Sequence, residues 1–135
     1  MPVYVFAEVQ EMLWEIMKVT QREFKLFKAE CLRYQKMLNL MDWVISITKN
    51  DLDGSLGRCT TRAANRVANI SLCNVWPSGE GKSKGVELIA AHEMTHLFLA
   101  TLSFLGECRY VTDSEIDLEN ERLAVVLERV LVRVK

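Results

Sequence analysis

The chain has 135 residues, of which 50% are hydrophobic and 26% charged, and its formal net charge is −1 at pH 7. That length is typical of one domain, and the apolar share is enough to form a core. A net charge near zero gives no indication of nucleic-acid binding, which normally needs a clustered basic surface. We therefore expect a single domain over residues 1–135.

The cysteines and the apolar runs predict a cytoplasmic protein. The N-terminus lacks the basic stretch and clean apolar segment of a signal peptide. The four cysteines form no Cys-x-x-Cys pair, which argues against a zinc ribbon or a thioredoxin-like motif. The longest apolar run, Leu97 to Leu105, is too short to span a bilayer. We expect reduced thiols and no membrane segment.

The first part of the chain, residues 1–41, has helical periodicity. Apolar side chains recur at helical spacing from Phe6 to Met41. Thr20 and Glu23 have the spacing of a capping box, which predicts a break near Thr20 and a new helix after it. We expect an N-terminal helix, or two, that packs through its Met- and Phe-rich side.

Residues 42–85 are predicted to form a small sheet and a loop. The alternating segment Trp43–Thr48 predicts a strand, and Asp53-Gly54 is the strongest turn signal after it. The segments Arg58–Thr61 and Arg66–Leu72 predict two more short strands, paired antiparallel. In the second of these, Asn69 and Ser71 alternate with apolar residues as on the two faces of an edge strand. Residues 74–85 read as a loop.

Residues 86–135 are predicted to form two helices. Val86–Leu105 is apolar almost all round, so we expect it to be buried on most sides, and Gly106 is well placed to end it. Thr112 and Glu115 have capping-box spacing and open a last helix that runs towards Val134. The order of helix, strands, helix and helix predicts the α+β class, with a small sheet.

The only two histidines of the chain, His92 and His96, lie four residues apart in the apolar helix, with Glu93 beside the first. Residues at this spacing share a helix face, so both imidazoles can bind one Zn²⁺ at about 2.0–2.1 Å. Glu93 can then act as general base on a water at the open zinc position. A random arrangement of this composition gives the H-E-x-x-H pattern roughly once in 700 times. If the imidazoles are buried, a bound metal would also offset their desolvation.

A catalytic zinc site needs three protein ligands and an open position. The chain has no third histidine, which leaves a carboxylate of the last helix or, as a weaker candidate, Cys108. If the last two helices form an antiparallel hairpin, residues 119–123 lie level with His96. Glu119 is then favoured, because it lies on the margin of the apolar face. The alternatives on the same helix are Glu121 and Glu115.

Through His92, Glu93 and His96 the chain resembles the zincin metallopeptidases. It differs from metzincins, because Leu99 and Leu102 stand where that group has a glycine and a third ligand. It is similar to the gluzincin type, in which a glutamate of the following helix is the third ligand. The small size is similar to that of minimal gluzincins and of the ImmA/IrrE-like and SprT-like intracellular metallopeptidases, although the SprT-like third histidine is missing.

This resemblance implies a zincin-like fold. Its parts would be an N-terminal helix or helices, an antiparallel-edged three-stranded sheet, the H-E-x-x-H helix and a C-terminal glutamate helix. It also implies a zinc metalloendopeptidase, in which a zinc-bound water activated by Glu93 hydrolyses peptide bonds. His92, His96 and Glu119 would hold Zn²⁺, and Tyr110 is a candidate donor to the oxyanion. A protein or peptide substrate would add a strand to the sheet edge.

Two other functions are compatible with the sequence. One is a non-catalytic zinc-containing binding or regulatory module, for example with Cys108 closing the fourth position of the metal. The other is a helical interaction protein in which the H-E-x-x-H pattern arose by chance. The first predicts zinc binding without turnover, and the second predicts no stoichiometric metal.

Overall fold

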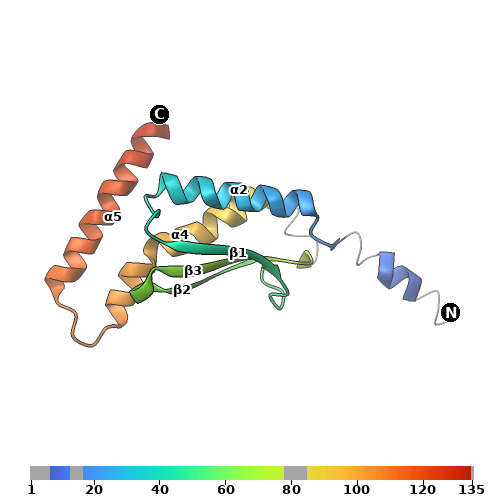
Figure 1. Ribbon diagram of the computed structural model, residues 1–135, viewed down its shortest axis with the longest axis horizontal. Helices are drawn as coiled ribbons and strands as arrows, with labels where there is room; N and C mark the ends of the chain where they lie inside the picture. Colours follow the sequence, from blue (N-terminus) through green and yellow to red (C-terminus); the bar gives the residue numbers. More distant parts are fainter. Residues whose placement is uncertain (1–6, 13–16, 78–84, 135) are drawn as a thin grey trace.

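The structure is a computed structural model that describes residues 7–12, 17–77 and 85–134 of the chain. A short helical segment spans residues 7–12. The elements that follow, shown in Figure 1, are α2 (Gln21–Met37), β1 (Val44–Asn50), β2 (Gly57–Arg62), a 3-10 turn (Ala63–Asn65), β3 (Val67–Cys73), α4 (Val86–Glu107) and α5 (Asp113–Val134). This order confirms the predicted α+β class.

The three strands form a mixed sheet in the order β1-β3-β2. Strand β2 pairs antiparallel with β3, as predicted, but β1 pairs parallel with β3. The prediction that β3 would be an edge strand is wrong, because it lies between the other two. Strand β3 is the most buried of the three, with Ala68, Ile70, Leu72 and Cys73 inaccessible. In a central position these side chains are shielded from water by the neighbouring strands, and the backbone of β3 is hydrogen-bonded on both sides.

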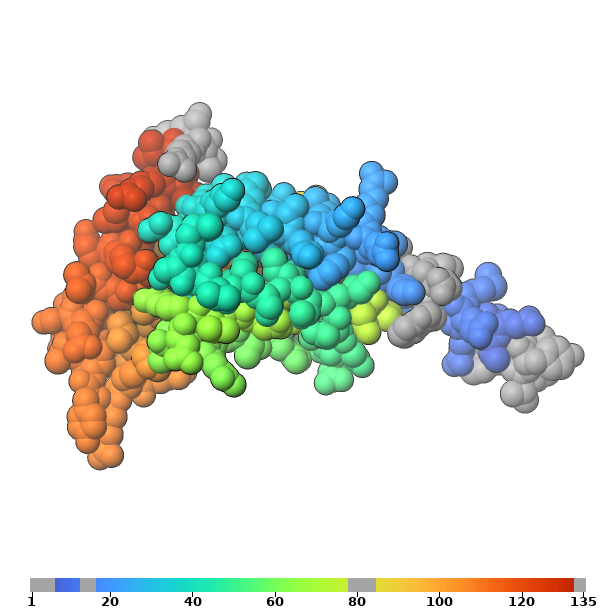
Figure 2. Space-filling model, in the orientation of Figure 1, coloured from blue at the N-terminus to red at the C-terminus, as the bar shows by residue number. Residues whose placement is uncertain are grey.

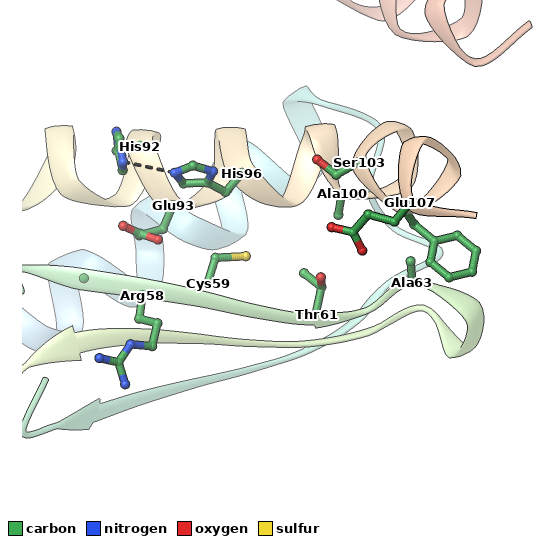
Figure 3. Close-up of a pocket in the computed structure, with 12 residues that line it drawn as sticks. Arg58, Cys59, Thr61, Ala63, His92, Glu93, His96, Ala100, Ser103 and Glu107 are labelled. Atoms are coloured by element: carbon green, nitrogen blue, oxygen red, sulfur yellow. Dashed lines mark hydrogen bonds between the residues drawn. The ribbon is translucent and has the colours of Figure 1, made fainter. Parts of the chain in front are cut away.

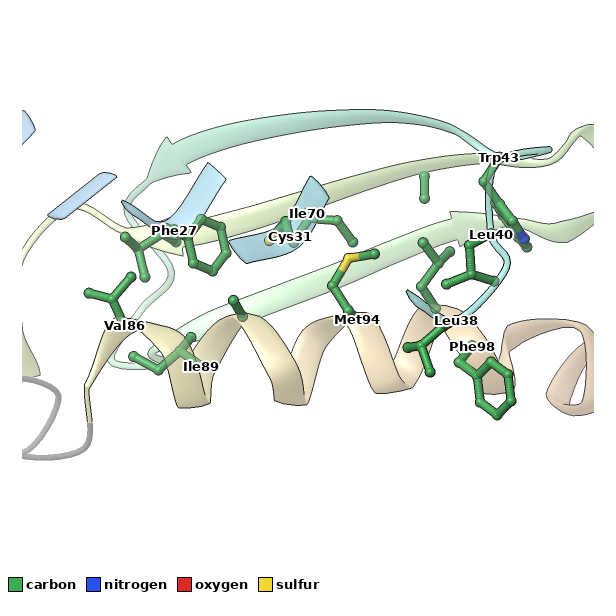
Figure 4. Close-up of a cluster of buried hydrophobic side chains, with 14 of the residues drawn as sticks. Phe27, Cys31, Leu38, Leu40, Trp43, Ile70, Val86, Ile89, Met94 and Phe98 are labelled. Carbon is green, nitrogen blue, oxygen red and sulfur yellow. The ribbon is translucent and has the colours of Figure 1, made fainter. Parts of the chain in front are cut away.

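Helices α2 and α4 pack against each other and cover one face of the sheet (Figure 1). The core lies between these two helices and the strands, as Figure 4 shows. It includes Phe27 and Cys31 from α2, Ile70 from β3, and Ile89 and Met94 from α4. The apolar side of α2 that the sequence predicted is therefore a core surface.

Helix α4 runs two residues past its predicted end. Gly106 lies inside the helix, which ends at Glu107, and Cys108 leaves it in an extended conformation (φ −75°, ψ 132°). Because the chain exits through an extended residue, no left-handed glycine is needed there. The prediction that Gly106 ends the helix is therefore wrong by about two residues.

By length and composition alone, α4 could also cross a membrane: it has 22 residues and a window of mean hydropathy 1.3. The core helix of a folded domain meets the same test. In this structure 39% of that window is buried, and Ala90, Met94 and Leu97 of α4 lie in the core.

Helix α5 starts as the sequence predicts, because the Thr112 hydroxyl accepts a hydrogen bond from the backbone N–H of Glu115 at 3.2 Å. It then turns away from α4, so that the two helices form a V in Figure 1. Leu123 and Val126 hold α5 to the core. In Figure 2, α5 lies at one end of the molecule and residues 7–12 lie at the other. The predicted loop of residues 74–85 and the helix before Thr20 fall partly outside the described residues.

The capping box at Thr20 starts α2 and can be tested directly. The Thr20 hydroxyl accepts from the Glu23 N–H at 3.1 Å, and Glu23 Oε1 accepts from the Thr20 N–H at 2.9 Å. We expect Thr20→Ala to lower the free energy of unfolding by about 1 kcal/mol, measured by urea denaturation. The control variant Thr20→Ser keeps the hydroxyl, so its free energy of unfolding should fall by much less. Equal losses in the two variants would contradict the capping role.

Candidate functional site

A groove of about 510 Å³ runs between α4 and β2 (Figure 3). From α4 it is lined by residues of one helix face, which recur at three- or four-residue spacing: His92, His96, Ala100, Ser103 and Glu107. From the edge strand it is lined by the alternating residues Gly57, Cys59 and Thr61. Figure 3 shows the side chains of Cys59 and Thr61 directed towards the helix. Both histidines and Glu93 therefore open onto one groove beside the edge of the sheet.

The two imidazoles lie close together, with their Nε2 atoms facing each other. Their Nε2 atoms are 3.2 Å apart, and their rings are nearly perpendicular, at 81°. Two nitrogen ligands at about 2.0–2.1 Å from a tetrahedral zinc would lie about 3.3–3.4 Å apart. The distance between His92 and His96 is close to the spacing of two ligands of one metal ion.

The same distance also fits a hydrogen bond between the two rings, in which one neutral imidazole donates its N–H to the other. Either arrangement needs at least one ring with a free nitrogen lone pair. Both histidines are exposed, so no metal is needed to offset a burial of their rings. The apolar side chains of α4 face the core instead, and the histidine face of the helix is open to the groove.

Glu93 is the buried acid of the site, with 6% of its surface exposed. Figure 3 shows its carboxylate below α4, on the side of β2. Burial raises the pKa of the Glu93 carboxyl above its ordinary value, and the neighbouring His92 and His96 partly oppose that shift. A carboxyl with a raised pKa can both accept and release a proton closer to neutral pH, as general acid–base catalysis requires.

Cys59 is the one thiol that lines the groove in the described part of the chain. Burial, with the charge of Glu93 as a second cause, raises its pKa to about 12. The Cys31 thiol behind it, in the core, likewise has a pKa raised to about 12 by burial. Both are neutral thiols at physiological pH, which argues against a cysteine nucleophile in this groove.

The predicted third ligand does not join the histidines. Within the described ranges, no three His, Cys, Asp or Glu residues are grouped so that they could hold a metal. The Glu119 carboxylate is mostly buried and accepts two hydrogen bonds from Arg122, at 2.6 and 3.0 Å. The predicted antiparallel hairpin is replaced by the V of α4 and α5. Glu119 as a zinc ligand therefore stays a prediction that this arrangement does not support.

The other candidate residues also lie outside the groove. Glu115 takes part in the cap at Thr112, and Glu121 is exposed on α5. Cys108 follows His96 by twelve residues, which is about 18 Å along a helix axis. Tyr110 is 85% exposed beyond the end of α4. The structure thus gives no role in the groove to any of these four.

Sequence reasoning did not identify Cys59 and Thr61 of β2 as groove residues. The segment had been predicted as a strand, but its alternation of Cys59 and Thr61 with Arg58 and Thr60 could have shown which residues share a face. Gly57 and Glu107 carry no such sequence signal. They enter the site only because β2 and α4 lie side by side.

A comparison of the chain with known protein families, with curated proteins and with solved structures finds no match. The zincin-like fold and the gluzincin resemblance therefore rest on His92, Glu93 and His96. What the geometry adds is that these three residues share a groove beside an edge strand.

The raised pKa of Glu93 predicts a pH-dependent stability. Ionised Glu93 is costly in the fold, so at pH 7–8 without metal we expect Glu93→Gln to have a higher Tm than wild type. The stability that protonated Glu93 gives is fully present below its unfolded pKa, about 4.3, and is lost as the pH rises through the raised folded pKa. The Tm difference should therefore vanish below about pH 4.

The matched control for this measurement is Glu121→Gln, which removes an exposed glutamate from α5. Its Tm should not rise relative to wild type as the pH increases. A lower Tm for Glu93→Gln than for wild type at neutral pH would contradict the desolvation of Glu93.

Proposed function

We propose that the chain is a zinc-dependent peptidase whose active site is the groove between α4 and β2. His92 and His96 would bind the metal, and Glu93 would be the general base. The observation that carries the proposal is the 3.2 Å distance between the two Nε2 atoms, next to a buried carboxylate in the same groove.

A zinc ion bound there would act as a Lewis acid on a peptide carbonyl and would acidify a water molecule. Glu93 would take the proton from the attacking water and deliver it to the departing amine, since its pKa is raised towards the pH at which both steps are needed. His92 and His96 would be neutral in this state and would leave their lone pairs to the metal. Gly57 and Cys59, on the other wall, would keep the Glu93 side chain out of bulk water.

The substrate that fits this groove is an extended segment of a protein or peptide. Strand β2 is an edge of the sheet, and within residues 7–12, 17–77 and 85–134 no other strand pairs with its outer side. An extended peptide could therefore pair with it there. Small side chains line the groove beyond the histidines, including Ala63, Ala100 and Ser103. They leave room for a bound main chain along β2.

A metal-binding module without turnover is the second candidate. It is favoured by one observation, namely that the described part of the chain brings no third protein ligand to the histidines. A site with two protein ligands holds zinc more weakly than the three- or four-ligand sites of proteins in general. This candidate predicts zinc bound at the pair, with no hydrolysis that depends on Glu93.

Zinc binding and its dependence on the histidines form the first test. For protein purified without added metal or chelating resin, we expect about one zinc per chain by elemental analysis, lost in His96→Ala. His96 is exposed, so the variant should fold normally by circular dichroism. Thr95→Ala is the matched control. Thr95 directly precedes His96 on α4, is exposed, and lies outside the groove. No zinc in wild type, and none taken up on titration, would contradict both candidates.

Glu93→Gln separates the two candidates. Under the peptidase proposal this variant keeps its zinc and loses about 10²- to 10⁴-fold of its hydrolysis of an unfolded protein substrate such as casein. If wild type binds zinc and cleaves nothing above the rate of Glu93→Gln, the binding module is the function that remains.

A further inference from the structure

Gly57, the first residue of β2, is in unusually close contact with α4. A Cβ atom at this position would lie 3.0 Å from Glu93 Cγ, 3.0 Å from Ile89 Cγ2 and 3.2 Å from Glu93 Oε1. Distances this short are tighter than ordinary van der Waals contacts, which for carbon atoms are about 3.5–4.0 Å. The space that a side chain would occupy at residue 57 is thus already filled by α4.

The backbone of Gly57 does not itself require glycine. It has no positive φ, whereas Gly54 and Gly85 have φ of +90° and +85°. A Cβ at Gly106 would meet no atom within 4 Å, because that residue faces open space. Among the described glycines, Gly57 is therefore the one whose missing side chain makes room for a residue of the candidate active site.

Of the two residues that fill this space, Glu93 is the one able to move. Ile89 is 3% exposed and packed in the core, so it cannot give way without disturbing its neighbours. The Glu93 side chain borders the groove on its other side, together with His92 and His96. A methyl group on residue 57 would therefore push the Glu93 carboxylate away from β2 and into the groove.

We propose that Gly57 is a positioning residue for Glu93: its bare backbone lets the Glu93 side chain lie against the edge strand, which fixes where the carboxylate stands relative to the two imidazoles. Its importance for catalysis rests on the proposed function. The contact between Gly57 and Glu93 is independent of the proposed function, because these residues pack together without metal or substrate.

The contact itself is tested by a double-mutant cycle on the metal-free protein. We expect Gly57→Ala to lower Tm in the wild-type background and to lower it by less than half as much in a Glu93→Ala background, where the clashing Cγ and Oε1 atoms are gone. Gly106→Ala is the control in both backgrounds and should not lower Tm. If Gly57→Ala lowered Tm equally in the two backgrounds, the contact with Ile89 alone would account for the need for glycine at residue 57. That result would overturn the proposal.

The consequence for catalysis is tested on the zinc-loaded protein. A displaced general base lowers kcat, so we expect Gly57→Ala to reduce kcat about 10- to 100-fold while KM and zinc content stay close to those of wild type. Gly106→Ala should leave all three unchanged. An unchanged kcat in Gly57→Ala, or a loss of zinc that accounts for the fall in rate, would overturn the positioning role.

The two experiments keep the two proposals apart. If wild type hydrolyses nothing, the peptidase proposal fails, and the cycle still decides whether Gly57 sets the position of Glu93. If hydrolysis is present and the cycle shows no coupling, the peptidase proposal stands and the Gly57 inference fails.

Discussion

The packing of α4 is the constraint on which the groove depends. Its core face, which includes Ala90, Met94 and Leu97, packs towards α2 and the sheet. Side chains at three- or four-residue spacing share a face, so fixing these residues also fixes where His92 and His96 point. A rotation of the helix that buried the imidazoles would expose Met94, which is completely buried, and would lose its transfer free energy of about 1.5–3 kcal/mol. The core thus holds the histidines at the sheet edge.

Glu93 lies where these two faces of α4 meet. Its neighbour Met94 is in the core and its neighbour His92 is exposed, so the carboxylate is close to water and yet shielded from it by β2. Arg58 of β2 also lines the groove, but Figure 3 shows its side chain directed away from Glu93. A buried carboxylate is a cost to the fold, as the direction of its pKa shift indicates. Costs of this kind are typical of residues retained for chemistry. Packing alone does not explain a glutamate at this position, because a leucine would fill the space without that cost.

The sequence predicted the features that depend on neighbours along the chain. The caps at Thr20 and Thr112 and the shared face of His92 and His96 need only three- or four-residue spacing. The features it missed depend on segments far apart in sequence. Ser71 alternates with apolar residues as in an edge strand, yet β3 is central because β1 and β2 both pair with it. The exposure of the histidines was missed because α4 is apolar almost all round, and composition alone does not tell which face lies open.

Whether a carboxylate of α5 can reach the histidines depends on the angle between α4 and α5. No local sequence pattern sets that angle. Glu119 and Arg122 are on one helix, and Arg122 is 39% exposed, so their ion pair is worth little and would not by itself keep Glu119 from a metal. The larger obstacle is the burial of Leu123 and Val126, since swinging α5 towards the histidines would remove them from the core at about 1.5–3 kcal/mol each. To bring Glu119 to the histidines, the whole of α5 would therefore have to move against this packing.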